Sequence, residues 1–333
     1  MEDNYAKILR DGYGIRFYSG MRARTGFVAK TDRGLKEIKK TQRSMAEIVF
    51  EHKAKEHLYQ KGFQNIGRFC TTVEGSPFFT LDTVQYTVED AVSAQPMDES
   101  KEESFLKGAE VLGELHQASA GFCCEEKRSN LGTLPKLYER RKNELMRIKK
   151  NIDKKSSYNP LDLMVKQNFS YYIEKTDEAL SLLLSCGYEQ AIQRAEEEKV
   201  LCHNAFKGDN IRCMESGELH ITGFEECAYD TPLVDLVSYL RRFLKKTDGG
   251  VGTAEEMMYR YHEKRHLSKQ DMNIIVGILT YPDKFMRLCN EYYNKRQVCI
   301  SPAVRERMEV CIAEKEKQDL FLEEFRKIQW KFS

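Results

Sequence analysis

The chain has 333 residues, 41% of them hydrophobic, so it can form two domains or one large two-lobed unit with a sizeable core. Lysine plus arginine number 53 and aspartate plus glutamate 52, a net charge of +1, which argues against a dedicated nucleic-acid-binding protein. No run reaches the ~18 apolar residues of a membrane span, and the start lacks a signal peptide's apolar region, so no membrane partner is expected. The ten cysteines include no CxxC pair, which indicates reduced thiols rather than a metal site.

Strand-like runs dominate the first 84 residues. The stretches GIRFYSG, TGFVAKT and RGLKEIKK are rich in β-branched and aromatic residues and are separated by turns. The segment SMAEIVFEHKAKEHLYQKGF then has one apolar helical face and reaches Gly62, where a helix would stop. Residues 1–84 are therefore predicted to form an N-lobe of antiparallel sheet plus one helix.

Helical periodicity dominates residues 85–333, which we expect to form a C-lobe. Amphipathic patterns recur in KEESFLKGAEVLGELHQAS, in KLYERRKNELMRIKKNI and in TPLVDLVSYLRRFLKK. One β-like island, residues 200–227, interrupts them and carries most of the polar signatures. A strand-rich front, a helical back and a polar island predict an α+β fold of two lobes with a cleft between them.

The island has the frame of a phosphotransferase loop. The stretch CHNAFKGDN begins an HxDxxxxN pattern at His203 and ends it at Asn210, a residue type that can hold a metal and brace the loop. Ala205 stands where a carboxylate would orient the attacking hydroxyl, and a methyl group cannot accept a proton. In ITGFEEC, Gly223 takes the position of the metal-binding aspartate before Phe224, and glycine offers no side-chain ligand to Mg²⁺. The same site has therefore lost two chemical groups.

Neighbouring carboxylates could replace the lost ones. Asp209 precedes Asn210, and Glu225 follows Phe224. Both are displaced along the chain from the expected positions, and catalysis tolerates a misplacement of only about 1 Å before large rate losses. Asn210, Asp209 and Glu225 are the remaining candidate metal ligands.

Lys36, in the third strand-like run, is the candidate for pairing with nucleotide phosphates. The alternative is an ordinary surface lysine beside Lys39 and Lys40. Glu51, on the following helix, has the spacing of the glutamate that pairs with such a lysine, and Glu47 is its competitor. Lys36, Glu51 and Asn210 are thus the predicted cofactor-binding residues.

The cofactor they imply is ATP, with Mg²⁺ weakly bound or absent. The hinge that would help to hold it is expected near residues 81–86. Removal of the carboxylate at Gly223 also removes a charge that would repel phosphates. ATP binding without a metal is therefore a third hypothesis for the cleft.

Several further stretches carry a resemblance to a known family. They are HLYQKGF, LGELHQASAGF, CHNAFKGDN, ITGFEECAYDTPLVDLVSYLRRFLKK and YPDKFMRLCNEYYNKR. In order and spacing they resemble the CotS family of bacterial spore coat proteins, over about residues 15–325. The resemblance implies a protein-kinase-like bilobal fold of the aminoglycoside phosphotransferase and choline kinase type.

The resemblance also implies residue roles and a location. Family members read His-x-Asp-x-x-x-x-Asn and then Ile-Asp-Phe-Asp, so His203 and Asn210 match while Ala205 and Gly223 depart. Asp235 matches an aspartate that would brace the His203 loop rather than do chemistry. The implied protein is made in the mother-cell cytoplasm of an endospore-forming bacterium and joins the spore coat, with other coat proteins as partners.

Two hypotheses describe the activity. The first is a non-catalytic, pseudokinase-type coat protein that acts by binding, because both chemical carboxylates are missing. The second is an active ATP-dependent phosphotransferase, of the aminoglycoside, choline or sugar kinase kind, with displaced carboxylates.

Overall fold

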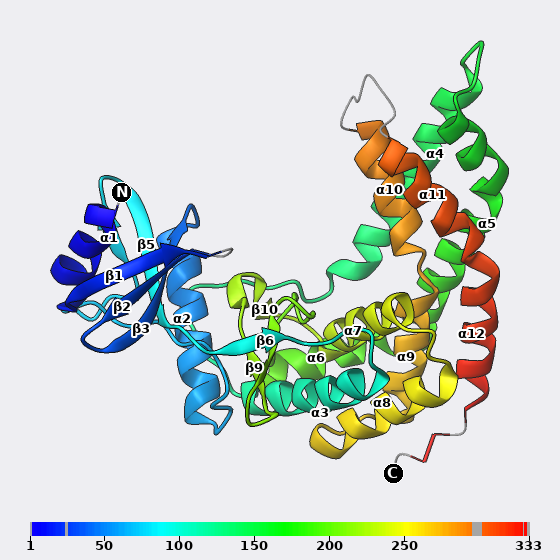
Figure 1. The fold of residues 1–333 in the computed structure, drawn as a ribbon. Helices are drawn as coiled ribbons and strands as arrows, with labels where there is room; N and C mark the ends of the chain where they lie inside the picture. Colours follow the sequence, from blue (N-terminus) through cyan, green and yellow to red (C-terminus); the bar gives the residue numbers. More distant parts are fainter. Residues whose placement is uncertain (1, 24–25, 295–301, 329, 332–333) are drawn as a thin grey trace.

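An antiparallel sheet of five strands forms the N-lobe in the computed structural model, which describes residues 2–23, 26–294, 302–328 and 330–331. The strand order is β1-β2-β3-β5-β4. The strands are β1 (Phe17–Arg22), β2 (Phe27–Thr31), β3 (Gly34–Thr41), β4 (Phe79–Leu81) and β5 (Val84–Asp90). A mainly helical C-lobe follows, so the predicted α+β bilobal fold is confirmed (Figure 1).

The two faces of the sheet have different partners because side chains alternate along a strand. On β3, Lys36 and Ile38 are buried on one face, where Ile38 joins a small core with Phe27, Ala29 and Val88. The π-helical η1 (Ile8–Gly12) contributes Ile8 and Leu9 to this core, and Tyr5 of the short helix α1 (Glu2–Lys7) packs against it. The other face of the sheet carries charged side chains toward α2.

The helix α2 (Met45–Gln60) lies between the sheet and the C-lobe (Figure 1). It begins at a capping box in which Ser44 and Glu47 exchange hydrogen bonds, and Gly62 follows its end with a φ of +93°. Its apolar residues Phe50, Ala54 and Leu58 belong to the large core that extends through the C-lobe. The helix predicted from the sequence is therefore present and ties the two lobes together.

The predicted lobe boundary at residue 84 is wrong, because β5 begins there and pairs with both β3 and β4. The segment 81–86 is not a hinge either. It contains the tight β4–β5 turn, with left-handed backbone at Asp82 and Thr83. The connection between the lobes follows β5, and its strand β6 (Ala94–Pro96) pairs with a strand of the C-lobe island. The stretch VQYTVED alternates between apolar and polar residues, as a strand does, but its start falls within the segment predicted as the hinge.

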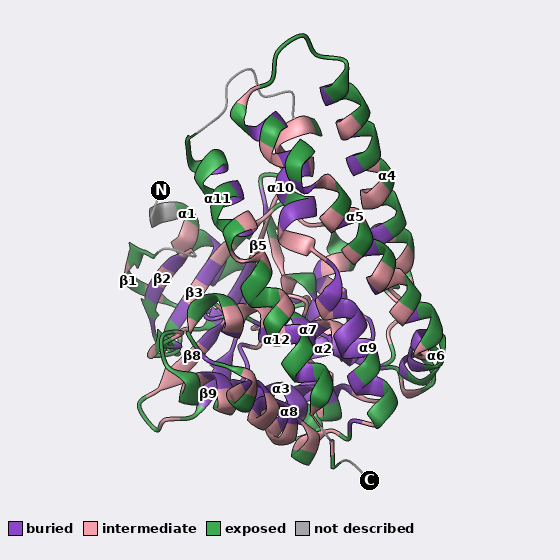
Figure 2. Ribbon diagram, turned by 90° about the vertical axis from the view of Figure 1, so that its right-hand side faces the viewer, coloured by how far each residue is buried: buried purple, intermediate pink, exposed green. Residues whose placement is uncertain are grey.

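Nine helices surround the C-lobe core in the described part of the chain. They are α3 (Glu102–Ser119), α4 (Thr133–Asp153), α5 (Pro160–Ser185), α6 (Tyr188–Glu198), α7 (Pro232–Lys246), α8 (Val251–Lys264), α9 (Lys269–Thr280), α10 (Asp283–Asn294) and α11 (Pro302–Ala313), with α12 (Lys315–Lys327) running along the outside. Buried residues gather on α7 and α9, while outward faces of α4 and α11 are exposed (Figure 2). Among the helices described, none is long and apolar enough to cross a membrane.

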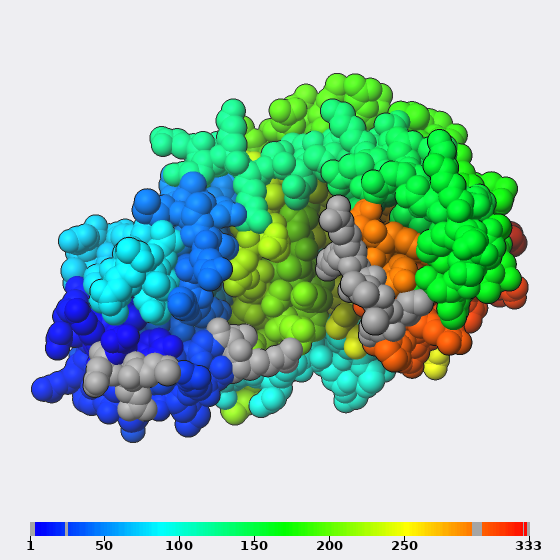
Figure 3. All heavy atoms as spheres, turned by 90° about the horizontal axis from the view of Figure 1, so that it is seen from above, coloured from blue at the N-terminus to red at the C-terminus, as the bar shows by residue number. Residues whose placement is uncertain are grey.

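The predicted island is a set of short strands between the lobes. Its elements are β7 (Leu201–Cys202), β8 (Ile211–Met214), β9 (Leu219–Ile221), the 3-10 turn η2 (Phe224–Glu226) and β10 (Ala228–Tyr229). The order β6-β8-β9 makes one small sheet, and β7 pairs with β10. From above, the molecule is hollowed between the N-lobe and the distal helices, and the yellow-green floor has the colour of the island and α7 (Figure 3).

Candidate functional site

His203 is the centre of the island loop and is fully buried. Its Nε2–H donates to the carbonyl of Thr222 at 3.0 Å, and its Nδ1 accepts the backbone N–H of Ala205 at 3.2 Å. Its ring packs against Phe224, with 4.5 Å between centroids. Burial lowers the pKa of His203 despite the nearby Asp235. The neutral imidazole therefore connects the loop to the end of β9 by hydrogen bonds and does not transfer protons in the cleft.

Asp235, in the first turn of α7, holds the start of the same loop. Its carboxylate accepts the backbone N–H of His203 at 2.5 Å and that of Asn204 at 2.8 Å. These two bonds fix a left-handed backbone at Asn204, whose φ is +58°. This is the geometry that a bracing role requires, and it keeps Asp235 out of the cleft.

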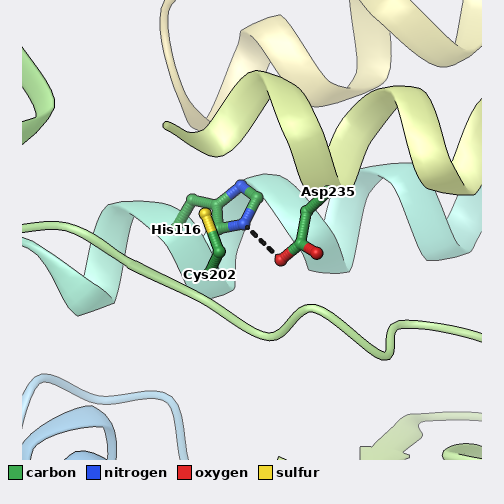
Figure 4. A group of neighbouring side chains, drawn as sticks. All are labelled: His116, Cys202 and Asp235. Atoms are coloured by element: carbon green, nitrogen blue, oxygen red, sulfur yellow. Dashed lines mark hydrogen bonds and ion pairs between the residues drawn. The ribbon is translucent and has the colours of Figure 1, made fainter. Parts of the chain in front are cut away.

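A buried cluster of His116, Cys202 and Asp235 has the residue types of a metal site (Figure 4). Its atoms are otherwise engaged. His116 lies between the Tyr261 hydroxyl at 2.8 Å and Asp235 at 3.2 Å, and both oxygens of Asp235 already accept backbone N–H groups. Burial also raises the pKa of the Cys202 thiol well above its usual value, which keeps it protonated. The cluster is a hydrogen-bonded core beneath the loop.

Ala205 and Asn210 face each other across the loop. The Asn210 side-chain amide donates to the Ala205 carbonyl at 2.9 Å, and its backbone carbonyl accepts the N–H of Thr222 at 2.9 Å. Asn210 thus holds the loop against the strand that leads to Gly223. The position of Ala205 contributes a backbone carbonyl and a methyl group, with no group that could orient a nucleophile.

Gly223 adopts a left-handed conformation with a φ of +77°. A β-carbon at this position would lie 2.5 Å from both Cγ and Oδ1 of Asn210. The chain here is therefore packed around the missing side chain, and an aspartate would require Asn210 to move. The left-handed backbone and the position of Asn210 both disfavour a larger side chain at Gly223.

The two candidate replacement carboxylates point to different places. Asp209 is exposed, and its charge acts on Arg242 of α7, although Glu99 is the larger cause of the raised pKa of Arg242. Glu225 is half-buried in η2, where its backbone carbonyl accepts a hydrogen bond from Arg128. The Glu225 charge acts on Lys39 and on His203. Glu225 is thus the carboxylate nearer to the sheet, and Asp209 lies toward α7.

The described residues do not fit a conventional Mg²⁺ site. Such a site takes several oxygen ligands from carboxylates in near-octahedral geometry. Ala205 and Gly223 supply none, Asn210 offers a single side-chain oxygen, Oδ1, and the charge of Asp209 acts on Arg242. We therefore assign no metal-dependent step to this cleft.

Lys36 lies on the face of the sheet opposite to the one expected. Its ammonium forms an ion pair with Asp90, its cross-strand neighbour, and lies near Cys70 on the side of the small N-lobe core. The prediction that Lys36 pairs with Glu51 is wrong. The alternation of the strand explains this, because residues at even positions of β3 face away from α2.

Lys39, set aside as a surface residue from the sequence, faces α2. Its Nζ lies 3.2 Å from Glu89 and 3.6 Å from Glu37. Burial alone would lower the pKa of Lys39, but these carboxylates raise it above its usual value. The lysine that could meet phosphates in the cleft is therefore Lys39.

Glu51 pairs with two cations other than the strand lysines. Its oxygens lie 2.6 Å from Lys55 and 2.6 Å from Arg43. Lys55 is fully buried, also lies 2.6 Å from Glu89, and sits over the ring of Phe69 at 3.8 Å from the centroid. Sequence reasoning missed Lys55 and Glu89; the only signal was an i, i+4 acid–base pair on α2, which is usual on solvated helices.

Glu99, in the connection between the lobes, is a second residue that sequence reasoning missed. It accepts the backbone N–H of Gly208 at 3.0 Å and the Arg242 Nε at 2.6 Å. A β-carbon at Gly208 would lie 2.5 Å from its carboxyl carbon. The Glu99 carboxylate thus joins the lobe connection to the 203–210 loop and to α7.

Solved kinases share this fold. An aminoglycoside phosphotransferase from Alicyclobacillus acidocaldarius aligns with a TM-score of 0.84 and 18% identity, covering 93% of this chain and 92% of its own. A spectinomycin phosphotransferase, solved with ADP and spectinomycin, aligns with a TM-score of 0.61 and 15% identity over 94% of this chain and 98% of its own. The amicoumacin kinase hAmiN, solved with AMP-PNP and Ca²⁺, aligns with a TM-score of 0.57 and 12% identity, covering 95% of this chain and 93% of its own.

Sequence comparison gives the family. Spore coat protein S of Bacillus subtilis (strain 168) is 27% identical over 280 residues, which cover 80% of this chain and 77% of its own. Residues 6–325 match the family described as "Spore coat putative kinase YutH". The resemblance to spore coat proteins is thus confirmed, and the chain belongs to this YutH family of kinase-like spore coat proteins.

Proposed function

We propose that this protein acts in spore coat assembly by binding, and that its kinase-like cleft does not transfer phosphate. The observation that carries the proposal is the packing at Gly223, where a β-carbon would lie 2.5 Å from Asn210. A site that had lost only the carboxylate side chain would still have space for an aspartate at this position. Here the side chain of Asn210 occupies that room, while His203 and Asn210 still hold the loop.

The charges on the cleft side of the N-lobe support the same proposal. Lys39 and Lys55 are already paired with Glu89, and Glu51 is shared between Lys55 and Arg43. In an active protein kinase the lysine that contacts the phosphates of ATP pairs with one glutamate. Here Lys39 lies between two carboxylates, those of Glu37 and Glu89, which leaves it less available to the phosphates.

Membership of the YutH family supports a location in the spore coat and other coat proteins as partners. Synthesis in the mother-cell cytoplasm before incorporation is part of the same proposal. It can be followed with a fluorescent fusion during sporulation. Fluorescence that stays dispersed in the mother cell through spore release would contradict it.

A phosphotransfer assay tests the proposed lack of catalysis. The purified chain is incubated with labelled ATP, with Mg²⁺ or Mn²⁺, and with sugars, amino alcohols, aminoglycosides and coat proteins as acceptors. We expect no transfer above background. Transfer that Lys39→Ala abolishes, and that Lys40→Ala leaves intact, would establish an active phosphotransferase instead, because Lys40 neighbours Lys39 but is exposed.

The same assay addresses displaced carboxylates. Glu225 is the stronger candidate, since its charge acts on Lys39, whereas Asp209 acts on Arg242. If transfer is found, Glu225→Gln should remove it and Asp209→Asn should not. Wild-type activity in both variants would exclude catalysis by either displaced carboxylate.

Nucleotide binding without catalysis is a second candidate function, favoured by the position of Lys39 on the cleft side. We expect it to be weak and independent of Mg²⁺, because Lys39 already contacts two carboxylates and a metal has no ligand set. Titration with a fluorescent ATP analogue, with and without Mg²⁺, measures it. Binding that strengthens with Mg²⁺ would contradict the assignment, and Lys36→Ala serves as the control on the opposite face.

A further inference from the structure

Five cations lie where the end of α7 comes close to the start of α10: Arg241 of α7 donates a hydrogen bond to the carbonyl of Tyr281, two residues before α10 begins. We call this group the α7–α10 basic surface; its residues are Arg242, Lys245, Lys246, Lys284 and Arg287. Lys245, Lys246 and Arg287 are exposed, and the other two are partly exposed. Burial and then the charges of the other four lower the pKa of Lys245. The four charges that act on Lys245 are all positive, so the group is electrostatically crowded.

Carboxylates compensate this surface only in part. Glu99 contacts Arg242 at 2.6 Å and Lys246 at 3.5 Å, and Glu314 contacts Lys284 at 2.7 Å. Within the part of the chain that the structure describes, no carboxylate forms an ion pair with Lys245 or Arg287. Like charges held together repel one another and create a positive potential that attracts anions.

Helix geometry explains only half of the arrangement. Cations in the last turn of α7 are favoured by the partial negative charge at a helix C-terminus. Lys284 lies in the first turn of α10, where the partial charge is positive and cations are disfavoured, and Arg287 lies in the next turn. The helix dipole therefore does not account for the cations of α10.

We propose that the α7–α10 basic surface binds an acidic peptide segment of a protein partner. The inference rests on the proposed binding role and names the chemistry that the partner presents. Aspartate and glutamate side chains can pair with lysine and arginine across an exposed surface and steer association. The surface adjoins the kinase-like loop, because Glu99 joins Arg242 to the Gly208 N–H.

The remaining features favour a peptide over other polyanions. The whole chain carries a net charge of only +1, without the broad basic excess of a nucleic-acid-binding protein. Of the large apolar side chains that are well exposed in the described structure, none belongs to α7 or α10. The surface therefore has neither aromatic platforms for bases nor apolar residues that would enter a lipid bilayer.

Fluorescence anisotropy with a labelled oligoglutamate peptide tests the proposal on the full chain. The variant Lys245→Gln/Arg287→Gln removes the two cations that lack a carboxylate partner within the described residues. The control Lys30→Gln/Lys40→Gln makes the same change of charge on exposed residues of the N-lobe sheet. We expect the wild type to bind, the first variant to bind roughly tenfold more weakly, and the control to match the wild type. Circular dichroism and thermal unfolding confirm that each variant is folded.

Two kinds of result would overturn the proposal. One is no peptide binding at low salt, or equal weakening in both variants. The other is tighter, α7–α10-dependent binding of a single-stranded oligonucleotide or of phosphatidylserine vesicles, which would assign the surface to that class. These outcomes are separate from the proposed function, since phosphate transfer by the wild type would refute that function and leave the peptide result unchanged.

Discussion

A β-carbon on Gly223 would lie 2.5 Å from the Cγ of Asn210, closer than two such carbons can pack. The sequence motif predicts that Gly223 takes the position of a metal-binding aspartate and Asn210 that of the loop asparagine. The retained residue thus occupies the space next to the lost one. Simple restoration of the aspartate is blocked by the backbone and by the neighbour together.

Gly223→Asp is therefore expected to destabilise the fold by about 2–5 kcal/mol, adding a left-handed backbone penalty to a packing penalty. Gly217→Asp is the matched control, because Gly217 has a φ of +82° on the same island but open space around it. We expect about 1–2 kcal/mol there, since only the backbone penalty applies. Urea unfolding monitored by circular dichroism measures both, and equal losses would contradict the close packing at Asn210.

Lys55→Met should cost about 3–5 kcal/mol, because it leaves the buried carboxylates of Glu51 and Glu89 short of a partner. The control Lys53→Met removes an exposed pair with Glu126 and should cost far less, because solvent screens exposed ion pairs. Chemical denaturation at neutral pH gives both values. Similar costs for the two variants would mean that the buried network adds little stability.

Asp230→Asn should stabilise the protein progressively as the pH rises. Burial raises the pKa of Asp230 from 3.8 to about 7, so between these values the folded state holds a proton that the unfolded state has released. Stability is then lost as pH rises through this window, and the asparagine variant escapes the loss. We expect no effect near pH 4 and a gain of about 2–4 kcal/mol above pH 7.

Thermal and urea unfolding across this pH range measures the gain at Asp230. Asp248→Asn, at an exposed position, is the control for a general effect of replacing an aspartate by asparagine. If Asp230→Asn raises the free energy of unfolding by the same amount at every pH, burial does not raise the pKa of the Asp230 carboxyl group.

Glu99→Gln should loosen the kinase-like loop. The neutral amide accepts the Gly208 N–H less strongly and loses its ion pair with Arg242. Loss of a charged hydrogen bond is worth about 1.5–3 kcal/mol, so amide hydrogen exchange of the loop peptide should accelerate about tenfold or more. Mass spectrometry of exchange over residues 205–210 measures it, with Glu103→Gln, exposed on α3, as the control. Unchanged exchange would mean that Glu99 does not hold the loop.

The sequence by itself predicted the bilobal fold and the two departures from the kinase-like motif. Helical spacing and the glycine at its end located α2, and amphipathic periodicity located long C-lobe helices such as α4, because such a helix must bury one face. The motif frame from His203 to Asn210 carried the resemblance to spore coat proteins. The replacements at Ala205 and Gly223 could be read directly from the sequence, because the residues of a local motif are close together along the chain.

Only the tertiary structure decided which residues meet across the lobes. A one-residue shift in strand register reverses the face on which a side chain lies, so Lys36 and Lys39 could not be told apart from the sequence. Glu89 is distant along the chain from Lys39 and Lys55, and so is Arg242 from Glu99. These partners come together only when the sheet, α2 and α7 pack. The closure around Gly223 likewise depends on Asn210, which the fold of the island places beside it.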